Sequence, residues 1–377
     1  MLIGVPKEIK AQEYRVGLVP AGVREVTRIG GKVLIEHDAG RGIQISDDDY
    51  RAAGAEVVDT AEEIFGRADL VVKVKEPQPE ECRRLRPGQT LFTFLHLAPD
   101  LEQIHLLQAS GVTAIAYETV TQPGGGLPLL TPMSEVAGRL SIQAGAHCLE
   151  KAQGGKGKLL GGVPGVPPAH VVVLGGGVVG TQAIQMAIGM GARVTVLDNS
   201  LPRLRWLDSQ FQTSLCTLYA THEAIEMATM DADLLIGAIL IPGAAAPKLV
   251  TRTMISRMQP GSVVVDVAID QGGCLATSHA TTHQEPTFLV DDVVHYCVGN
   301  MPGAVPQTST YALTNATLPF IMNMVAKGVK PALLADPHLL NGLSVHAGHL
   351  TYAAVAEAAQ GIYIPARDAL NNMAHYA

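Results

Sequence analysis

The segment from Val171 to Asp198 constrains the fold of this chain more than any other, because it predicts a strand, a glycine-rich turn, a helix and a second strand in succession. Val171 to Leu174 are four apolar, mostly β-branched residues, which is typical of a fully buried strand. The run from Gly175 to Gly180 then satisfies G-x-G-x-x-G, and helical spacing of apolar residues follows. A second strand run, Arg193 to Leu197, closes on Asp198. This order is the dinucleotide-binding pattern of a parallel α/β sheet.

Each part of the pattern has a physical reason. Gly175 permits the tight turn, Gly177 lets a pyrophosphate approach the backbone, and Gly180 lets the helix pack closely on the strand. Asp198 stands where a carboxylate accepts both ribose hydroxyls and repels a 2′-phosphate, so the site should prefer NAD over NADP. The alternative is an ordinary glycine-rich turn. The flanking strands, the helix and the terminal Asp together favour the dinucleotide site.

The N-terminal 125 residues or so predict one α/β unit, because strand runs alternate with helical runs. Such alternation is typical of a parallel, doubly wound sheet with helices on its faces. The expected strands are Leu2–Val5, Lys32–Glu36, Glu56–Val58, Leu70–Val74, Thr90–Leu95 and Thr113–Tyr117.

A second α/β unit is expected around the dinucleotide segment. A long helix should follow a glycine-rich loop, with Thr131 as its N-cap and Pro132 at N1. Helical stretches near 308–326 and 346–360 have no strands of their own, so we expect the chain to return to the first unit. The predicted fold is two Rossmann-like doubly wound domains with a cleft between them. Residues 1–128 plus 305–377 form the substrate and catalytic domain, and residues 129–304 form the NAD-binding domain. Further strands of the second sheet are expected at Asp233–Ile236, Ser262–Val267 and Thr287–Val290.

Composition excludes several other classes of protein. Hydrophobic residues make up 47% and charged residues 16%, which supports sizeable cores and argues against disorder. The formal net charge of −8 and the lack of any Lys/Arg run argue against a nucleic-acid partner. No apolar run is long enough to span a membrane, and no signal peptide is recognisable. Five scattered cysteines without C-x-x-C indicate reduced thiols in a cytoplasmic protein.

Four polar residues follow strand runs of the predicted sheets. In open α/β sheets, ligands bind outside the carboxyl ends of the strands. Arg15 follows the first strand, Lys75 follows LVVKV, His96 follows LFTFL and Asp270 follows SVVVDVAI. Arg15 could clamp a carboxylate bidentately, and Lys75 could neutralise it or polarise a carbonyl. His96 could pass the proton that accompanies hydride transfer, and Asp270 could act on nitrogen or hold the nicotinamide ribose.

Each of these residues also has a structural interpretation. A Lys or Arg after a strand is usually a solvated surface residue. His96 could be a structural histidine beside an apolar run, and Asp270 in I-D-Q-G-G could form an Asx-turn. Glu118, which also follows a strand run, is a possible metal ligand, but no partner spacing supports it and no metal site is expected.

Read together, these passages resemble the alanine dehydrogenase/pyridine nucleotide transhydrogenase family. The N-terminal GVPKEIKAQEYRVGLVPAGV is similar to the family signature G-[aliphatic]-P-x-E-x-x-x-N-E-x-R-V, and the glycine-rich passage resembles a second signature. VKVKEP, FTFLHLA, TPMSEVAG and VAIDQGG resemble further family blocks, so the likeness covers essentially the whole chain. The first signature is specific to the family, whereas the glycine-rich one is shared more widely.

The resemblance implies an oxidoreductase that catalyses reversible NAD-dependent oxidative deamination of L-alanine to pyruvate and ammonium. It implies formate/glycerate-dehydrogenase-like domains and a cytoplasmic homo-hexamer. Arg15 and Lys75 would bind the substrate, and His96 and Asp270 would be the acid/base pair, with either one able to perform each proton transfer. The implied NAD contacts are Ser134, Gly175, Gly177, Val178, Gly180, Asp198, Arg203, Ile239, Leu240, Val267, Asp270, Val298, Asn300 and Met301.

Three departures from the family and three rival functions accompany this interpretation. Gln12 replaces the signature's Asn, Thr27 stands where an aliphatic residue is usual, and Ala220 stands where a cofactor-contacting Ser is expected. The first rival is the NAD-binding coupling subunit of a proton-translocating transhydrogenase, which the set Arg15, Lys75 and His96 disfavours. The second is a dehydrogenase of a larger amino acid, and the third is a non-catalytic NAD sensor.

Overall fold

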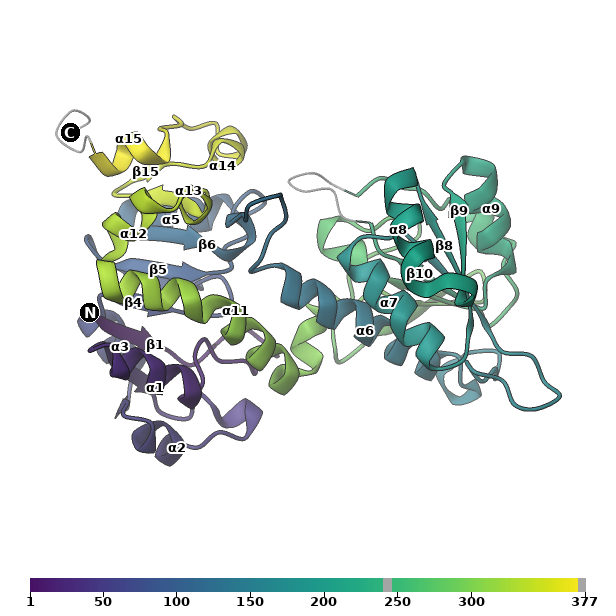
Figure 1. Ribbon diagram of the computed structural model, residues 1–377, viewed down its shortest axis with the longest axis horizontal. Helices are drawn as coiled ribbons and strands as arrows, with labels where there is room; N and C mark the ends of the chain where they lie inside the picture. Colours follow the sequence, from purple (N-terminus) through teal and green to yellow (C-terminus); the bar gives the residue numbers. More distant parts are fainter. Residues whose placement is uncertain (240–245, 372–377) are drawn as a thin grey trace. The chain divides into compact units, whose positions relative to one another are not determined.

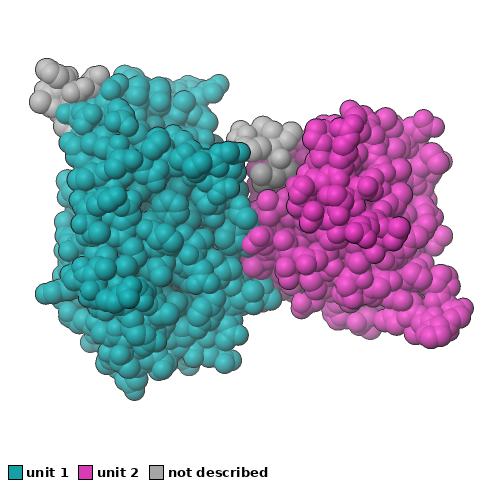
Figure 2. All heavy atoms as spheres, viewed as in Figure 1, with its two compact units in different colours: residues 1–133, 305–377 teal, residues 134–304 magenta. Residues whose placement is uncertain are grey.

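In a computed structural model the chain forms two compact units, and the structure describes residues 1–239 and 246–371 (Figure 1). Unit 1 combines the two ends of the chain, Met1–Met133 and Val305–Ala377, and unit 2 is the continuous stretch Ser134–Ala304 (Figure 2). Across those described residues, no helix has the length and apolar character needed to cross a membrane.

Unit 2 contains a seven-stranded sheet in the order β12-β13-β11-β10-β7-β8-β9. Strands β7, β8 and β9 run outward to one side of the sheet and β10, β11 and β13 to the other, which is the strand order of a Rossmann fold. All neighbouring pairs are parallel except β12 and β13. The strands are β7 (His170–Leu174), β8 (Arg193–Asp198), β9 (Leu215–Tyr219), β10 (Leu234–Gly237), β11 (Val263–Asp266), β12 (Thr287–Val290) and β13 (Val293–Tyr296). The helices are α6 (Thr131–Cys148), α7 (Val178–Gly189), α8 (Leu201–Phe211), α9 (His222–Asp231) and α10 (Arg252–Ser256).

The sequence pattern missed two strands of this sheet. Strand β9 lies at the sheet edge, and its partly exposed residues lack a continuous apolar run. Strand β13 forms a hairpin with β12, so β12 is an antiparallel edge strand rather than another parallel core strand. The two turn residues, Asp291 and Asp292, have φ values of 49° and 61°, which is the left-handed pair of a type I′ hairpin turn.

Unit 1 contains an eight-stranded sheet in the order β15-β14-β6-β5-β4-β1-β2-β3. Its first six strands in the chain are parallel and repeat the Rossmann order, and β14 and β15 add an antiparallel edge beside β6. The strands are β1 (Leu2–Val5), β2 (Lys32–Glu36), β3 (Glu56–Val58), β4 (Leu70–Val72), β5 (Thr90–Thr93), β6 (Thr113–Ala116), β14 (Leu343–His346) and β15 (His349–Leu350).

The helix predicted near residues 346–360 is confirmed only for α14 (Ala353–Ala358) and is wrong for the residues before it. Residues 343–346 and 349–350 instead form β14 and β15. The chain reverses at Ala347 and Gly348, whose φ values are 47° and 86°. Val345 and Leu350 pair across this turn and are buried against the sheet, so pairing with the edge at β6 and burial favour strands at the start of the stretch.

Helices cover the sheet of unit 1. Helices α3 (Ala61–Arg67) and α5 (Leu101–Ser110) contribute Phe65, Ile104 and Leu107 to one buried cluster with the strands. In Figure 1 the long helix α11 (Pro306–Lys327) crosses in front of the sheet, and it packs against α1 and α12. The remaining helices are α1 (Pro20–Arg28), α2 (Asp47–Ala52), α4 (Pro79–Cys82), α12 (Val329–Ala335), α13 (Pro337–Leu340) and α15 (Ala366–Asn371).

Candidate active site

Both sheets reverse their strand order at one point, and several of the predicted site residues follow the strands at these points, among them Arg15, Lys75 and the glycine-rich turn. The reversal lies between β1 and β4 in unit 1 and between β7 and β10 in unit 2. Ligands of open α/β sheets bind at the carboxyl ends of the strands beside such a reversal. Each unit therefore has one edge of its sheet suited to a ligand, and the two edges carry different chemistry.

The glycine-rich turn of unit 2 has the geometry that a dinucleotide needs. Gly175 has a φ of 93°, and a Cβ there would lie 2.9 Å from the carbonyl oxygen of Ala238. A Cβ at Gly180 would lie 1.9 Å from the carbonyl oxygen of Gly175, so only glycine lets α7 pack this closely. Gly177 is exposed, and a Cβ there would meet nothing within 4 Å. It directly precedes Val178, the first residue of α7, so there is open space at the N-terminus of that helix. The structure confirms the steric limits predicted for Gly175 and Gly180, and pyrophosphate binding at Gly177 stays a prediction.

Asp198 ends β8 with a carboxylate fixed on both sides. Its Oδ2 accepts a hydrogen bond of 2.7 Å from the Gly176 amide, and its Oδ1 accepts one of 2.8 Å from the Ser200 amide. Arg203 donates through Nε to the carbonyl oxygen of Gly176, and its guanidinium carbon lies 4.2 Å from the ring centroid of Trp206. The acid is thus held beside the glycine-rich turn, where a ribose would lie.

A second group of predicted NAD residues gathers around Asp270. Asp270 lies in the 3₁₀ helix η5 (Val267–Gln271), which begins at Val267, another of the predicted NAD contacts. The Asn300 amide donates to Oδ1 of Asp270 over 3.3 Å, and Asn300 has a left-handed φ of 58°. Val298 and Met301, which flank that turn, are buried. The structure therefore brings Asp270 and the Val298–Met301 turn together, and the side chain of Asp270 bonds to Asn300 rather than forming a local Asx-turn.

The remaining predicted contacts of unit 2 are more dispersed. Ile239 follows β10, and its side chain lies beside Gly175. Ser134 lies in α6 and is partly exposed. Leu240 lies outside the described residues.

Asp266 is a residue that sequence reasoning missed, and it holds the loop that carries Asp270. Its carboxylate accepts hydrogen bonds from the amides of Ala268, Cys274 and Leu275 over 3.2, 2.9 and 3.3 Å. Burial raises the pKa of Asp266, although hydrogen bonds from Ser278, Leu275 and Cys274 oppose the shift. The side chain therefore clamps both ends of the loop after β11.

Arg15 lies in unit 1 in the segment between β1 and α1, and it is buried rather than solvated. Its Nε and Nη2 each donate to one oxygen of Glu13 over 2.6 Å, and its Nη1 contacts the sulfur of Met133 over 3.2 Å. The side chains of Arg15 and Glu13 are 2% and 0% exposed. This bidentate pair fixes the plane of the guanidinium.

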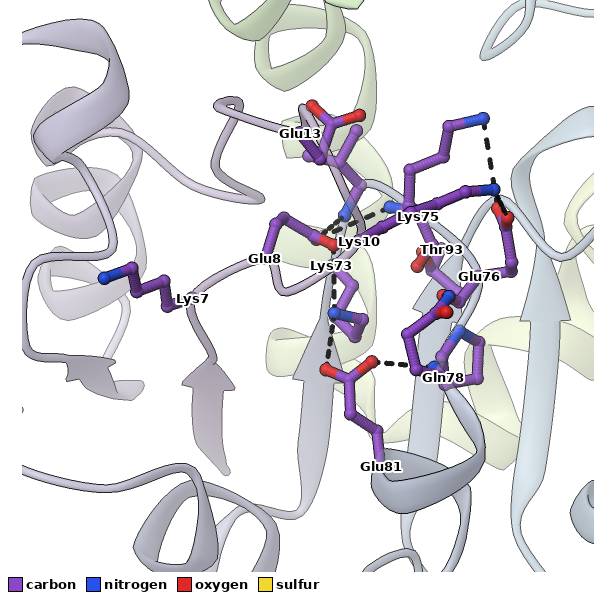
Figure 3. Close-up of polar contacts among 12 residues, drawn as sticks. Lys7, Glu8, Lys10, Glu13, Lys73, Lys75, Glu76, Gln78, Glu81 and Thr93 are labelled. Atoms are coloured by element: carbon purple, nitrogen blue, oxygen red, sulfur yellow. Dashed lines mark hydrogen bonds and ion pairs between the residues drawn. The ribbon is translucent and has the colours of Figure 1, made fainter. Parts of the chain in front are cut away.

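A buried ion triad determines the path of the chain that leads to Lys75. The Lys73 ammonium lies 3.0 Å from Glu8 and 2.7 Å from Glu81, and Figure 3 shows the two carboxylates on either side of it. The other oxygen of Glu8 accepts from the amides of Val74 and Lys75 over 2.6 and 3.4 Å. Burial lowers the pKa of Lys73, but the two carboxylates outweigh it and the pKa is raised. The triad thus ties the loop after β1 to the backbone of Lys75.

Lys75 and His96 both approach Glu76. Oε2 of Glu76 lies 3.9 Å from the Lys75 ammonium and 3.8 Å from Nδ1 of His96, and Lys10 from the loop after β1 pairs with the other oxygen (Figure 3). Burial raises the pKa of Glu76, but the interactions with His96, Lys75 and Lys10 outweigh it and hold the pKa well below its usual range. Unit 1 therefore gathers a carboxylate, two ammonium groups and an imidazole at the ends of β1, β4 and β5.

The backbone of His96 is held in an unusual conformation. Its φ is 49°, in the left-handed region that few residues other than glycine adopt, and its side chain is 46% exposed. The Glu118 carboxylate accepts hydrogen bonds from the His96 amide over 2.6 Å and from the Leu95 amide over 3.2 Å. The imidazole stacks on Phe94 with ring centroids 5.6 Å apart. Such strain persists where the surroundings determine it, and it is commonest at functional sites.

The low pKa of Glu76 gives a prediction for stability. Because the folded-state pKa lies below the usual 4.5, ionised Glu76 stabilises the fold above that pH, and this contribution is lost as pH falls towards the folded-state pKa. We expect Glu76→Gln to lower the thermal midpoint more at pH 7 than at pH 4. Thermal unfolding of both proteins at the two pH values measures this, and an equal difference at both would contradict it.

Most residues that sequence reasoning missed are carboxylates that hold another group. Glu8, Glu13, Glu76, Glu81, Glu118 and Asp266 all fall in this class, and Lys73 joins them as a buried cation. A weak signal existed for two of them, because a charged residue inside the apolar run LVVKV and a Glu in the N-terminal signature both need buried partners.

Comparisons with known proteins agree with this architecture. A model of the family described as alanine dehydrogenase/PNT, N-terminal domain, matches residues 4–137, and one for its C-terminal domain matches residues 141–353. The alanine dehydrogenase of Halomonas elongata is 60% identical over 95% of this chain and 96% of its own length. That of Bacillus subtilis is 52% identical over 99% of this chain and 98% of its own.

Solved structures give the same result. A structure of an L-alanine dehydrogenase has a TM-score of 0.92 and 53% identity, and covers 95% of this chain and 99% of that one. A transhydrogenase from Sinorhizobium meliloti has a TM-score of 0.79 and 25% identity, and covers 94% of this chain and 100% of that one. With family models matching both halves and relatives more than half identical over nearly its full length, the chain belongs to the alanine dehydrogenase/PNT family.

Proposed function

We propose that this chain is an NAD-dependent L-alanine dehydrogenase. The reaction converts L-alanine, NAD⁺ and water into pyruvate, ammonium, NADH and a proton, and it runs in both directions. The observation that carries the proposal is the set of Arg15, Lys75 and His96 at the strand ends of unit 1, in a chain whose unit 2 has a dinucleotide turn ending at Asp198. A substrate carboxylate, a transferable proton and a redox cofactor are what an amino-acid dehydrogenase must bind.

The residues of unit 1 suit a small 2-amino or 2-oxo acid. Glu13 holds the Nε–Nη2 edge of Arg15 and so fixes the plane in which the guanidinium would meet a substrate carboxylate. Lys75 would neutralise the same carboxylate or polarise the carbonyl oxygen of pyruvate. His96 and Asp270 would exchange the protons needed when water adds to the imine carbon and ammonia leaves. Either residue can fill each of these proton-transfer functions.

The residues of unit 2 fit NAD. Open space at Gly177 admits the pyrophosphate, the N-terminus of α7 offers its amides, and Asp198 would accept the ribose hydroxyls. NAD, when bound, accepts the hydride from Cα of alanine. The Asp270 and Asn300 pair would hold the nicotinamide end.

Asp198 should determine the preference for NAD over NADP. In Asp198→Ala the carboxylate that repels a 2′-phosphate is gone, and the nearby Arg203 guanidinium then attracts it. We expect the ratio of kcat/KM with NADH to that with NADPH to fall by about tenfold or more, which corresponds to one lost charged interaction. The measurement is reductive amination of pyruvate with each cofactor. Asp208→Ala, an exposed change in α8, should leave the ratio unchanged.

The function itself is tested by following NADH absorbance with the purified chain, pyruvate and ammonium, leaving out each in turn. Consumption that needs both co-substrates supports the proposal. Consumption without ammonium indicates a hydroxy-acid dehydrogenase on the same fold. NADH binding without consumption favours the coupling subunit or the sensor, and a preference for a larger 2-oxo acid favours a related amino-acid dehydrogenase.

We further propose that the chain acts in the cytoplasm as a homo-hexamer. All five cysteines are free, which suits a reducing compartment. The family resemblance supports the hexamer. Light scattering coupled to size-exclusion chromatography would give the mass of the assembly, and a monomer or dimer at micromolar concentration would overturn this assignment.

A further inference from the structure

We infer that Glu76 is a positioning residue for His96, holding its imidazole through Nδ1 so that Nε2 faces the reacting atoms. The inference deepens the proposed function and rests on it, because it assigns a partner to the acid/base residue of that reaction. It stands on the geometry of one carboxylate that three other side chains approach.

The two carboxylate oxygens of Glu76 differ in their hydrogen-bond partners. One oxygen, Oε1, pairs with Lys10 from the loop after β1 (Figure 3). The other, Oε2, is buried and accepts no hydrogen bond from the residues that the structure describes. It lies 3.8 Å from Nδ1 of His96 and 3.9 Å from the Lys75 ammonium. A buried carboxylate oxygen without a donor is costly, so a donor that can reach it will be drawn to it.

Nδ1 of His96 can reach Oε2 by a small movement. A charge-assisted N–H···O bond is about 2.7–2.9 Å long, so the imidazole needs to shift by about 1 Å. The Glu118 carboxylate holds the His96 amide and Phe94 stacks on the ring, so the movement left to this side chain is mainly a rotation of the ring. Catalytic hydrogen bonds are often long without substrate and tighten in the complex.

The bond has a chemical consequence for the imidazole. When a carboxylate accepts the proton of Nδ1, the neutral ring carries its lone pair on Nε2, and the protonated ring is stabilised. Lys10 and Lys75 keep Glu76 ionised and fix where its carboxylate lies. Glu76 thus sets the tautomer and orientation of His96 without touching the substrate itself.

The test is a double-mutant cycle on the intact chain. We would measure kcat, KM for pyruvate and KM for NADH in the wild type, Glu76→Gln, His96→Ala and the double variant, together with the thermal midpoint of each. Glu80→Gln in α4 is the matched control, because Glu80 is an exposed acid four residues along the chain. Should the glutamine variant fail to fold, Glu76→Asp takes its place, because it keeps the charge and should retain more activity.

We expect Glu76→Gln to lower kcat about 10- to 100-fold, as with other outer partners of functional histidines, while KM for NADH stays unchanged. In the His96→Ala background the same substitution should lower kcat less than about threefold, because residues that act as a unit are not additive. If Glu76→Gln lowers kcat by the same factor in the wild-type and His96→Ala backgrounds, or lowers it in neither, the inference about Glu76 is overturned and the proposed function still stands. A wild type that does not turn over pyruvate, ammonium and NADH overturns the proposed function and the inference with it.

Discussion

His96→Ala should lower kcat/KM for reductive amination of pyruvate by about 10²–10⁴-fold, the usual contribution of a positioned general acid or base. His96 is the imidazole that unit 1 places beside Lys75 and Glu76, and its left-handed backbone is held by Glu118. Alanine removes the proton-transfer group and keeps the β-carbon. The rate is measured by NADH absorbance at saturating ammonium.

Two accompanying measurements make this result specific. The dissociation constant for NADH should stay at the wild-type value, because the residues that fit NAD lie in unit 2. His105→Ala in α5 is the matched control, since that histidine is exposed and should tolerate the change. If His96→Ala retained normal turnover with a normal thermal midpoint, its assignment as an acid/base residue would be wrong.

Lys73→Met should lower the free energy of unfolding by about 3–5 kcal/mol, because it leaves the buried carboxylates of Glu8 and Glu81 without their cation. The Lys73 side chain is fully buried and those of the two acids are 2% exposed, so water cannot replace the ammonium. Native domains are stable by about 5–15 kcal/mol, so this single change removes a large share of the total. Denaturant unfolding of both proteins measures it.

The control for this prediction is Lys7, in the loop after β1 that carries Glu8. Lys7 is exposed, and Lys7→Met should change the free energy of unfolding by less than about 0.5 kcal/mol. Glu81→Gln keeps the shape of the triad and should cost less than Lys73→Met, so it provides a second variant if Lys73→Met does not fold. A loss below about 1 kcal/mol for Lys73→Met would show that the two acids bind protons or water instead.

The dinucleotide half of the fold could be predicted because its determinants are local. A fully buried strand, the steric limits at Gly175 and Gly180 and the acid Asp198 all lie within one short segment. The structure confirms those two steric limits, and it places Asp198 beside the turn through its bond to Gly176. Such constraints act through the backbone of neighbouring residues, so they are visible in sequence without knowledge of tertiary contacts.

The six parallel strands of unit 1 could also be predicted, whereas its edge strands β14 and β15 could not, because they depend on contacts between distant segments. Val345 belongs to a strand that pairs with the edge at β6, and nothing in the local sequence indicated that distant partner. Glu118 gave no sign of its function, since its partners are amides in the loop after β5. Arg15, Lys75 and His96, which are proposed to contact the substrate, could be found as polar residues that follow strands. Glu8, Glu76 and Glu118, which hold some of them, could not, because their partners come from segments after other strands.

The division of unit 1 between the two ends of the chain has a consequence for synthesis. Unit 2 is a continuous stretch, so all of its strands have been made before β14 and β15 are translated. Until then β6 is an open edge of the first sheet, with unpaired amides that can bind another strand. The nascent chain therefore carries one sheet whose strands are all present and one that awaits its last two. Premature termination after residue 340 would leave the first half permanently prone to aggregate.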